Sequence, residues 1–224
     1  MKEVYKFLKD LSRNNNREWF LANKQRYLDV KARVDELASL LIGLVSEFDP
    51  RASRLSASDC TYRIYRDTRF SNDKTPYKTH FGIFINPPLG KKGETLGYYF
   101  HLEPEASLVC AGTIWLPPKV LKAVRQSIVD EIDEYRGIVE SPDFKACYSE
   151  LGFDKLKTAP KGFDKDWEFI DYLRPRGFGA QSPVPDSFYD LDGLTERLRP
   201  YIRQAWLYNR FINYTVEEEL GVES

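Results

Sequence analysis

The stretch THFGIFINPPLGKKGETLGYYFHLEPEASLVCAGTIW, residues 79–115, decides the predicted fold. It contains three short runs that are rich in aromatic and β-branched residues and are separated by turn residues: Thr79–Asn86, Gly97–Glu103 and Leu108–Trp115. Runs of this length and composition are typical of β-strands. The last run has small or apolar side chains on both faces, as expected of a central strand that is covered on both sides. We therefore predict consecutive antiparallel strands in this stretch.

The preceding run, Tyr62–Asp67, has the same character, and we predict it as the first strand of the sheet. Helices are expected on both sides of the strand block. Upstream, Asn15 is a candidate N-cap with Glu18 completing a capping box, and the apolar stripe that follows must end before Pro50. Downstream, helical spacing and helix-start signals predict helices in four places: from Pro117, from Ser141 to near Gly152, briefly before Pro175, and from Leu191 to Ile212.

Strands in one block with helices before and after it indicate an α+β fold. We expect an antiparallel sheet of about four or more strands, packed by helices from the N- and C-terminal parts. The strict alternation of strands and helices that marks a parallel α/β sheet is absent from the pattern. No low-complexity linker interrupts the sequence. We therefore predict a single domain over residues 1–214 and an acidic, frayed tail over residues 215–224.

The composition is that of a globular protein without a dominant charge. Hydrophobic residues make up 42% of the 224 residues, charged residues make up 30%, and the net charge is -1. Such a chain has no general attraction to nucleic acid or to a membrane surface, and no run of ~18 apolar residues predicts a membrane span. The three cysteines, Cys60, Cys110 and Cys147, match no disulfide or zinc-ligand spacing. We therefore predict a cytoplasmic protein without a metal site or a membrane partner.

Positive charge is concentrated in residues 62–80, YRIYRDTRFSNDKTPYKTH. Between Thr61 and His80 there are five basic and two acidic residues, a local excess of +3 in a chain whose total is -1. Arginine forks and a lysine point charge suit the recognition of phosphate or carboxylate groups. We therefore predict that this strand, turn and strand binds a phosphorylated or otherwise anionic small molecule.

Residues outside this segment are expected to complete the site. Arg17 lies at a predicted helix N-terminus, which favours anions. Lys161 lies in a tight loop, APKGFD, in which Gly162 allows the backbone to approach a ligand closely. The predicted ligand-binding residues are Arg17, Arg63, Arg66, Arg69, Lys74, Tyr77, Lys78 and Lys161.

Proton transfer at the site would need a titratable group, and His80 and Asp67 are the candidate catalytic residues. His80 adjoins the cationic turn, and the ordinary pKa of histidine lies near neutral pH. His101 is the other histidine, and its pairing with Glu103 as acid and base is an alternative. The chain contains no GxSxG, HExxH, GxGxxG or P-loop motif. The pattern therefore assigns neither a reaction nor a cofactor.

Three other interpretations stay open. The arginines could pair with Asp67, Asp73 or Glu18 in a network that only stabilises the turn. Tyrosines interleaved with arginines could stack on the bases of RNA or single-stranded nucleic acid; they are Tyr62, Tyr65, Tyr98 and Tyr99. A non-catalytic interaction domain would instead expose an apolar patch. The sequence does not indicate an oligomeric state.

Four segments in this order, NNNREWF, YRDTRFSNDKTPYKTH, GYYFHLEP and APKGFD, resemble a bacterial and fungal family, the domain of unknown function 2461. The likeness spans roughly Tyr5 to Ile212. The family's RDxRF and DKTPYK signature is matched by Arg66, Asp67, Arg69, Phe70, Asp73, Lys74, Pro76, Tyr77 and Lys78, and its N-terminal motif by Asn15, Arg17, Trp19 and Phe20. Its PRGF loop looks to be PKGF, where Lys161 keeps the charge and loses the guanidinium fork. The resemblance implies a single intracellular domain and supplies no reaction, substrate or cofactor.

Overall fold

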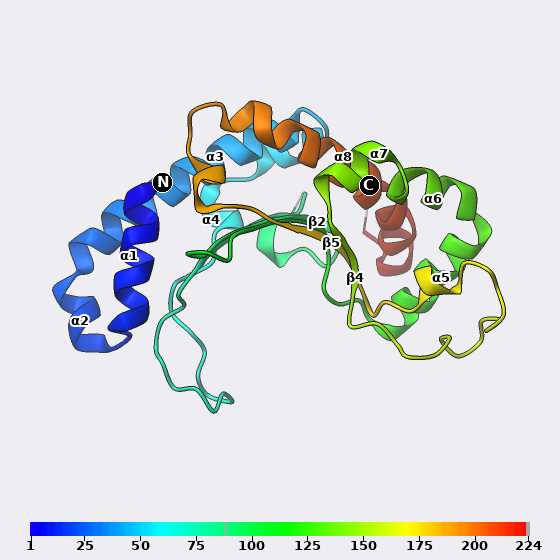
Figure 1. The fold of residues 1–224 in the computed structure, drawn as a ribbon, viewed down its shortest axis with the longest axis horizontal. Helices are drawn as coiled ribbons and strands as arrows, with labels where there is room; N and C mark the ends of the chain where they lie inside the picture. Colours follow the sequence, from blue (N-terminus) through cyan, green and yellow to red (C-terminus); the bar gives the residue numbers. More distant parts are fainter. Residues whose placement is uncertain (88, 223–224) are drawn as a thin grey trace. The chain divides into compact units, whose positions relative to one another are not determined.

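The fold is α+β, and its sheet has five antiparallel strands (Figure 1). The computed structural model describes residues 1–87 and 89–222. The order of the strands is β1-β2-β3-β5-β4. Their bounds are β1 (Phe81–Ile85), β2 (Gly97–Leu102), β3 (Leu108–Gly112), β4 (Glu150–Phe153) and β5 (Gly177–Pro183). The predicted fold class, an antiparallel sheet packed by helices from both ends of the chain, is confirmed.

The α-helices of the described residues are α1 (Lys2–Arg13), α2 (Arg17–Ala22), α3 (Lys24–Ser46), α4 (Ala57–Cys60), α5 (Pro118–Asp130), α6 (Ile132–Val139), α7 (Pro142–Cys147) and α8 (Leu194–Leu220). The long α3 ends before Pro50, as predicted, because a proline disfavours helical geometry in the residue that precedes it. The N-cap of α2 is Asn16, whose side chain accepts a hydrogen bond from the Trp19 amide at 2.9 Å. The prediction of Asn15 as this cap is wrong, and Asn15 has another role.

The contacts divide the chain into two compact units. The first comprises residues 1–93, 99–109 and 183–199, and the second comprises residues 94–98, 110–182 and 200–224. Each unit is therefore built from segments that are far apart in the sequence. The single domain over residues 1–214 stays a prediction. Residues 215–220 of the predicted tail are helical, and Val216 of α8 is fully buried.

The first unit buries an apolar stripe of α1 against α3. The fully buried residues of α1 are Val4, Phe7, Leu8 and Leu11, while its lysines lie on the other side of the helix. The Phe7 ring lies 6.2 Å from the Tyr27 ring of α3, measured between centroids. Each large apolar side chain that leaves water contributes about 1.5–3 kcal/mol. The helix pair is therefore a firm support for the segments that pack on it, including β1 on α3.

In the second unit, side-chain amides of α8 satisfy backbone groups where β2 begins. Asn213 accepts a hydrogen bond from the Leu96 amide at 2.7 Å and donates one to the Leu96 carbonyl at 3.0 Å. Asn209 donates to the Gly97 carbonyl at 3.0 Å. These bonds matter because a buried backbone group without a partner is costly.

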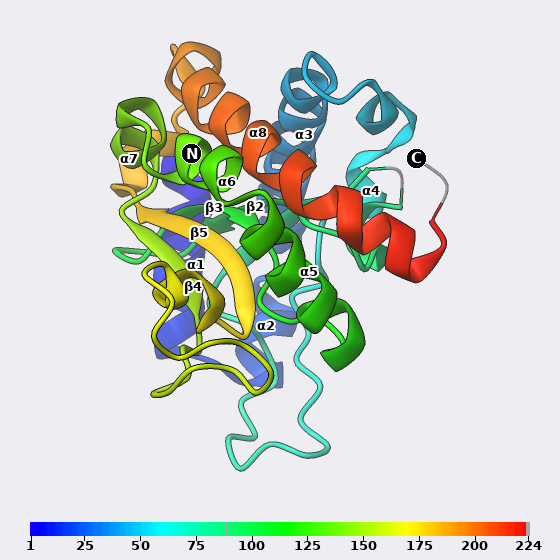
Figure 2. The same ribbon diagram turned by 90° about the vertical axis from the view of Figure 1, so that its right-hand side faces the viewer.

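The strands β4 and β5 lie side by side in the second unit (Figure 2) and are missing from the predicted elements. Their register shifts between Leu151 and Phe153. The Phe153 ring covers Gly179, where a Cβ atom would lie only 2.3 Å from a ring carbon, so the site needs glycine. The sequence of β5, GFGAQSP, has one aromatic and no β-branched residue, which hides the strand signal. The helix predicted to end near Gly152 ends at Cys147 instead.

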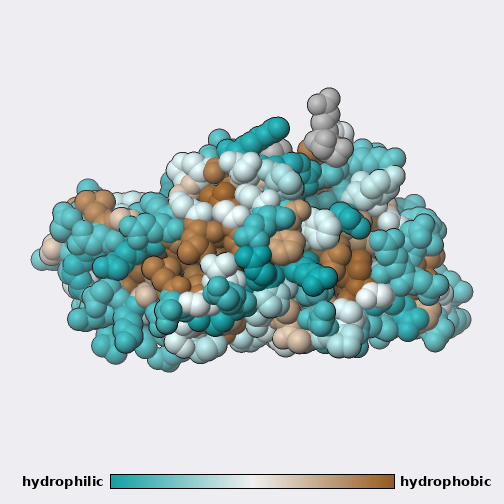
Figure 3. Space-filling view, turned by 90° about the horizontal axis from the view of Figure 1, so that it is seen from above, coloured by the Kyte–Doolittle hydropathy of each residue, from teal (hydrophilic) through white to brown (hydrophobic). Residues whose placement is uncertain are grey.

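The surface is largely polar where it can be seen. Figure 3 shows hydrophilic residues over most of one face, with hydrophobic residues in the hollows between them. Among the described residues, no helix combines the length and the hydropathy that a membrane crossing requires. The cytoplasmic location stays a prediction.

Candidate functional site

Residues 61–80 precede β1 in the chain and form an irregular two-stranded ribbon (Figure 1). The prediction of a regular strand over Tyr62–Asp67 is wrong, because only isolated bridges join Thr61 to Ile83 and Tyr65 to Tyr77. Between these bridges, three residues of the first arm face five residues of the second. Extra residues on one arm interrupt the hydrogen-bond ladder and bend the chain. The bend falls at residues 79 and 80, directly before β1.

Asn15 and Phe20 attach the ribbon to the helices of the first unit. The Asn15 side chain donates to the Tyr77 carbonyl at 2.9 Å and accepts from the Tyr77 amide at 3.1 Å, as a neighbouring strand would. The Phe20 ring stacks on the Tyr77 ring with centroids 4.0 Å apart and planes 15° apart. Tyr77 is 4% exposed. This residue, predicted to bind a ligand, is therefore placed as a structural anchor.

The tip of the ribbon, residues 66–75, contains an ion pair between Arg66 and Asp73. The Arg66 guanidinium also donates to the Thr75 hydroxyl, and Asp73 accepts the Thr75 amide proton at 2.9 Å. The hydrogen bond from the Thr75 amide and the one from Arg66 lower the pKa of Asp73 to about 2. Asp73 is therefore ionised at neutral pH and neutralises Arg66.

The remaining cations of the tip are also engaged. Arg69 pairs with Asp67, with 2.7 Å between Nη2 and Oδ2, and this hydrogen bond lowers the pKa of Asp67. Lys74 Nζ donates to the Thr68 carbonyl at 2.9 Å. Asp67, a predicted proton carrier, is therefore held as a carboxylate by its own neighbour.

The base of the ribbon, residues 77–80 together with the facing Tyr62, has a different charge balance. Lys78 Nζ lies 5.3 Å from the centre of the Tyr62 ring. The Lys78 side chain is half-buried and forms no ion pair with any residue that the structure describes. Burial lowers the pKa of Lys78, and the positive charge of Arg63 lowers it further. The ammonium group is thus partly removed from water without a carboxylate partner.

Next to Lys78, three side chains form what we term the His–Glu cluster: His80, His101 and Glu103. Their potential metal-ligand atoms all lie within 4.8 Å of one another. His101 Nε2 lies 3.0 Å from Glu103 Oε2. The two imidazole rings face each other with centroids 4.4 Å apart and planes 33° apart. The cluster therefore collects both histidines of the chain and one carboxylate.

Two hydroxyl groups orient the His–Glu cluster. The Tyr99 hydroxyl lies 2.9 Å from His101 Nδ1, and the Thr79 hydroxyl donates to Glu103 Oε1 at 2.9 Å. Tyr99, His101 and Glu103 share one face of the sheet because they alternate along β2 and its end. This alternation is a sequence signal for the three residues of β2 and its end, whereas the sequence predicted His80 only as a separate candidate and did not place it beside them.

Burial and hydrogen bonding set the protonation states of two members of the cluster, His80 and Glu103. Burial, followed by the positive potential of His101, lowers the pKa of His80 to about 4, while Glu103 only partly opposes this shift. Burial would raise the pKa of Glu103, but the hydrogen bonds from His101 and Thr79 outweigh it, so the pKa is lowered. At neutral pH, His80 is therefore a neutral imidazole and Glu103 a carboxylate.

The other predicted ligand-binding residues lie in different parts of the chain, and of these Arg63 is the one close enough to Lys78 to lower its pKa. Arg63 and Arg17 are exposed and form no ion pair with any described residue. Lys161 is exposed in a loop of the second unit. Of the predicted site, the structure thus brings Lys78 and His80 together, while Arg66, Arg69 and Lys74 belong to the tip.

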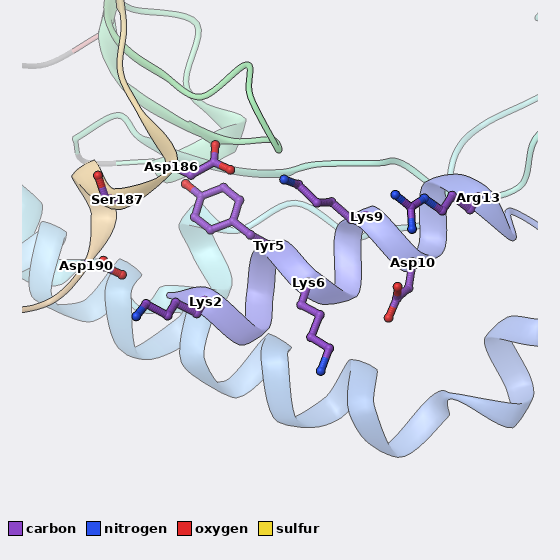
Figure 4. Close-up of a pocket in the computed structure, with 9 residues that line it drawn as sticks. All are labelled: Lys2, Tyr5, Lys6, Lys9, Asp10, Arg13, Asp186, Ser187 and Asp190. Carbon is purple, nitrogen blue, oxygen red and sulfur yellow. The ribbon is translucent and has the colours of Figure 1, made fainter.

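A cavity of about 500 Å³ lies along α1 in the first unit (Figure 4). Its lining residues are Lys2, Tyr5, Lys6, Lys9, Asp10, Arg13, Asp186, Ser187 and Asp190. Asp190 pairs with the N-terminal amine at 2.9 Å, and Asp186 accepts the Glu105 amide proton at 2.8 Å. Lys9 pairs with the Glu105 side chain at 3.0 Å. Because charges of both signs line the cavity and several are already paired, it does not select an anion.

The tyrosines of the nucleic-acid interpretation do not form an open stacking surface. Tyr98 is 3% exposed, and Tyr62 is half-buried beside Lys78. Tyr99 is half-buried, and its hydroxyl is hydrogen-bonded to His101. Tyr65 is 42% exposed, but its ring contacts the Phe20 and Tyr77 rings, and Lys24 Nζ lies 6.0 Å from its centre.

A comparison with protein-family models shows to which family the chain belongs. A family model described as "Conserved hypothetical protein (DUF2461)" matches residues 3–211. The chain belongs to this family. No match was found among the curated proteins or among the solved structures. The resemblance read from the sequence is thus confirmed, and the matched part of this DUF2461 protein includes the tip, the base and the His–Glu cluster.

Proposed function

We propose that this DUF2461 protein binds a small molecule with a phosphate or carboxylate group at the base of the ribbon. The observation that supports the proposal is the half-buried Lys78, which has no carboxylate partner among the described residues. A charge that is partly removed from water is unfavourable unless a counter-charge or hydrogen bonds compensate it. A bound anion would supply both.

The contrast with the tip narrows the predicted site. Arg66 and Arg69 already have carboxylate partners, so an anion that bound them would have to displace Asp73 or Asp67. Lys78 has no such competitor. Arg63 is close enough to lower the pKa of Lys78, so it adds positive potential at the same place. The anion site of the proposal is therefore the base, with Arg63 as its second cation.

His80 is the side chain of this site that could exchange a proton with the ligand. Its ring is half-buried and forms no hydrogen bond with any described residue, so one nitrogen can donate and the other can accept. Asp67 does not have this freedom, because Arg69 occupies both of its oxygens.

The test is isothermal titration calorimetry of the protein with inorganic phosphate, pyrophosphate and citrate, each at low ionic strength. It measures the dissociation constant of each anion. Lys78→Met should raise the dissociation constant about tenfold or more, because a charge-assisted hydrogen bond contributes ~1.5–3 kcal/mol. Lys74→Met is the matched control, since Lys74 lies on the same ribbon and is exposed, and it should change the constant less than about twofold.

Two results would overturn the proposal. One is the absence of saturable binding of all three anions to the unsubstituted protein. The other is loss of binding in Arg69→Glu with retention in Lys78→Met, which would move the site to the tip. Far-UV circular dichroism of each variant verifies that the fold is retained.

A further inference from the structure

The His–Glu cluster has the donor set of a metal site. Imidazole nitrogen and carboxylate oxygen are both ligands of zinc, and three protein ligands with an open fourth position are typical of zinc sites that also bind water or substrate. Two histidines and one carboxylate are also used by iron and manganese. We propose that His80, His101 and Glu103 bind a divalent transition-metal ion, for which zinc is the best-fitting probe.

The distances within the cluster are close to those that a metal ion requires. With a metal–ligand distance of ~2.1 Å, two ligands of a tetrahedral ion stand ~3.4 Å apart. His101 Nε2 and Glu103 Oε2 lie 3.0 Å apart, at hydrogen-bond distance and slightly closer than this spacing. The ligand atoms of all three residues lie within 4.8 Å of one another, so they need to move only a short distance to surround one ion.

His80 is the residue that must move to complete the site. Its ring lies tilted against the His101 ring, with 4.4 Å between centroids and 33° between planes, a ring contact and not the arrangement of two ligands around one ion. No hydrogen bond to a described residue holds the His80 ring in this orientation. A rotation of the His80 side chain can therefore bring one of its nitrogens toward the pair formed by His101 and Glu103.

The surrounding hydroxyl groups already orient the other two ligands. Metal-binding histidines usually hydrogen-bond through their second nitrogen, and metal-binding carboxylates are usually hydrogen-bonded as well. Tyr99 provides the first contact at His101 Nδ1, and Thr79 provides the second at Glu103 Oε1. The atoms left to face the ion are His101 Nε2 and Glu103 Oε2.

Metal binding would change the tautomer of His101. Without the ion, a proton on Nε2 can be shared with Glu103 Oε2. A metal ion between these atoms takes the Nε2 lone pair, so the proton must lie on Nδ1, where it is donated to the Tyr99 hydroxyl oxygen. The Tyr99 hydroxyl can accept this bond because it is both a donor and an acceptor.

The experiment uses the full-length protein without a histidine tag, stripped of metal with a chelator and titrated with zinc against a chromophoric competitor. We expect one zinc ion per chain. Glu103→Gln and His101→Ala should each weaken zinc binding at least about tenfold. Glu105→Gln is the matched control, because Glu105 lies two residues away, has an 83% exposed side chain and pairs with Lys9, and it should bind zinc as the unsubstituted protein does.

A second measurement separates metal binding from folding. The chain has two histidines, so its imidazole NMR signals all come from this cluster. Zinc should shift both sets of signals, and cobalt(II) should give the visible absorption of a tetrahedral nitrogen–oxygen site. Zinc should raise the melting temperature of the unsubstituted protein and not that of Glu103→Gln, because an ion that binds only the folded state stabilises it.

Three results would overturn the inference: no zinc binding at micromolar concentration, equal binding by Glu103→Gln and Glu105→Gln, or zinc binding that leaves both imidazoles unshifted. The metal site and the anion site share His80, but the first depends on His101 and Glu103 and the second on Lys78. Lys78→Met should lose anion binding and retain zinc, so the failure of one proposal can be recognised without the other.

Discussion

The tip and the base of the ribbon come from one continuous basic segment, yet they treat charge in opposite ways. At the tip, Arg66 pairs with Asp73 and Arg69 pairs with Asp67; the Arg66 side chain is 26% exposed, and the other three side chains are between 44% and 76% exposed. At the base, Lys78 is half-buried and has no carboxylate partner among the described residues. The same basic segment thus forms a turn whose arginines are neutralised at the tip, and leaves a lysine without a carboxylate partner among the described residues at the base.

The difference shows that a candidate anion site is indicated by a cation without an anionic partner, and not by the number of cations in a segment. An exposed ion pair contributes ~0–1 kcal/mol and needs no ligand. A partly buried cation without a counter-ion destabilises the protein unless something binds it, and such conflicts are typical of functional sites. The comparison therefore favours the base, beside the His–Glu cluster, over the more heavily charged tip.

The largest effect is expected from the anchor of the base. Tyr77→Ala should lower the free energy of unfolding by about 3–5 kcal/mol, because Tyr77 is 4% exposed and stacks on Phe20 at 4.0 Å. Phe70→Ala at the tip, where Phe70 is 94% exposed, should change it by less than ~0.5 kcal/mol. Urea denaturation measures both. Equal losses would show that tip and base are one structural unit.

A smaller effect of opposite sign is expected at Lys78. Lys78→Met should stabilise the free protein by about 0.5–1 kcal/mol, a modest gain because water still reaches the ammonium group. Lys74→Met should be neutral, since Lys74 is exposed. Thermal denaturation at low phosphate tests this. A loss of stability in Lys78→Met would mean that the ammonium group stabilises the fold, and the contrast between tip and base would disappear.

The ion pairs of the tip should contribute still less. A double-mutant cycle with Arg66→Ala and Asp73→Ala should give a coupling energy below ~1 kcal/mol, which falls as salt is added. Charge reversal in Arg69→Glu should likewise leave the melting temperature nearly unchanged. A coupling well above this range would make the tip a structural network and not a solvated turn.

The smallest effect is a pH dependence confined to the tip. The pKa of Asp73 is about 2 in the folded tip against an ordinary value of 3.8, so a disordered tip binds the proton more readily. The tip should therefore stay equally well ordered above about pH 4 and become disordered as the pH falls from about 4 to 2. NMR shifts of the Thr75 amide follow this change. Asp73→Asn is the control: the Thr75 amide should lose its transition, while Asp67, whose pKa is also lowered, still titrates at acidic pH.

Some of the molecule could be predicted from local sequence. The strands β1, β2 and β3 carry aromatic and β-branched runs bounded by turn residues, and α3 carries an apolar stripe that stops before Pro50. These features depend on residues close in the chain. The strand β5 could not be predicted in the same way, because Gly179 is required by the ring of Phe153, a residue of another strand.

By itself, the sequence determined the α+β class, the family signature and the place where positive charge is concentrated. The tertiary structure decided which charges are paired, because Asn15 and the shifted register of the ribbon separate Lys78 from the carboxylates of the tip. It also brought His80 of one strand end to His101 and Glu103 of the next strand. The physical reason is that pairing across a sheet is set by register and bends, and these depend on contacts between residues far apart in the chain.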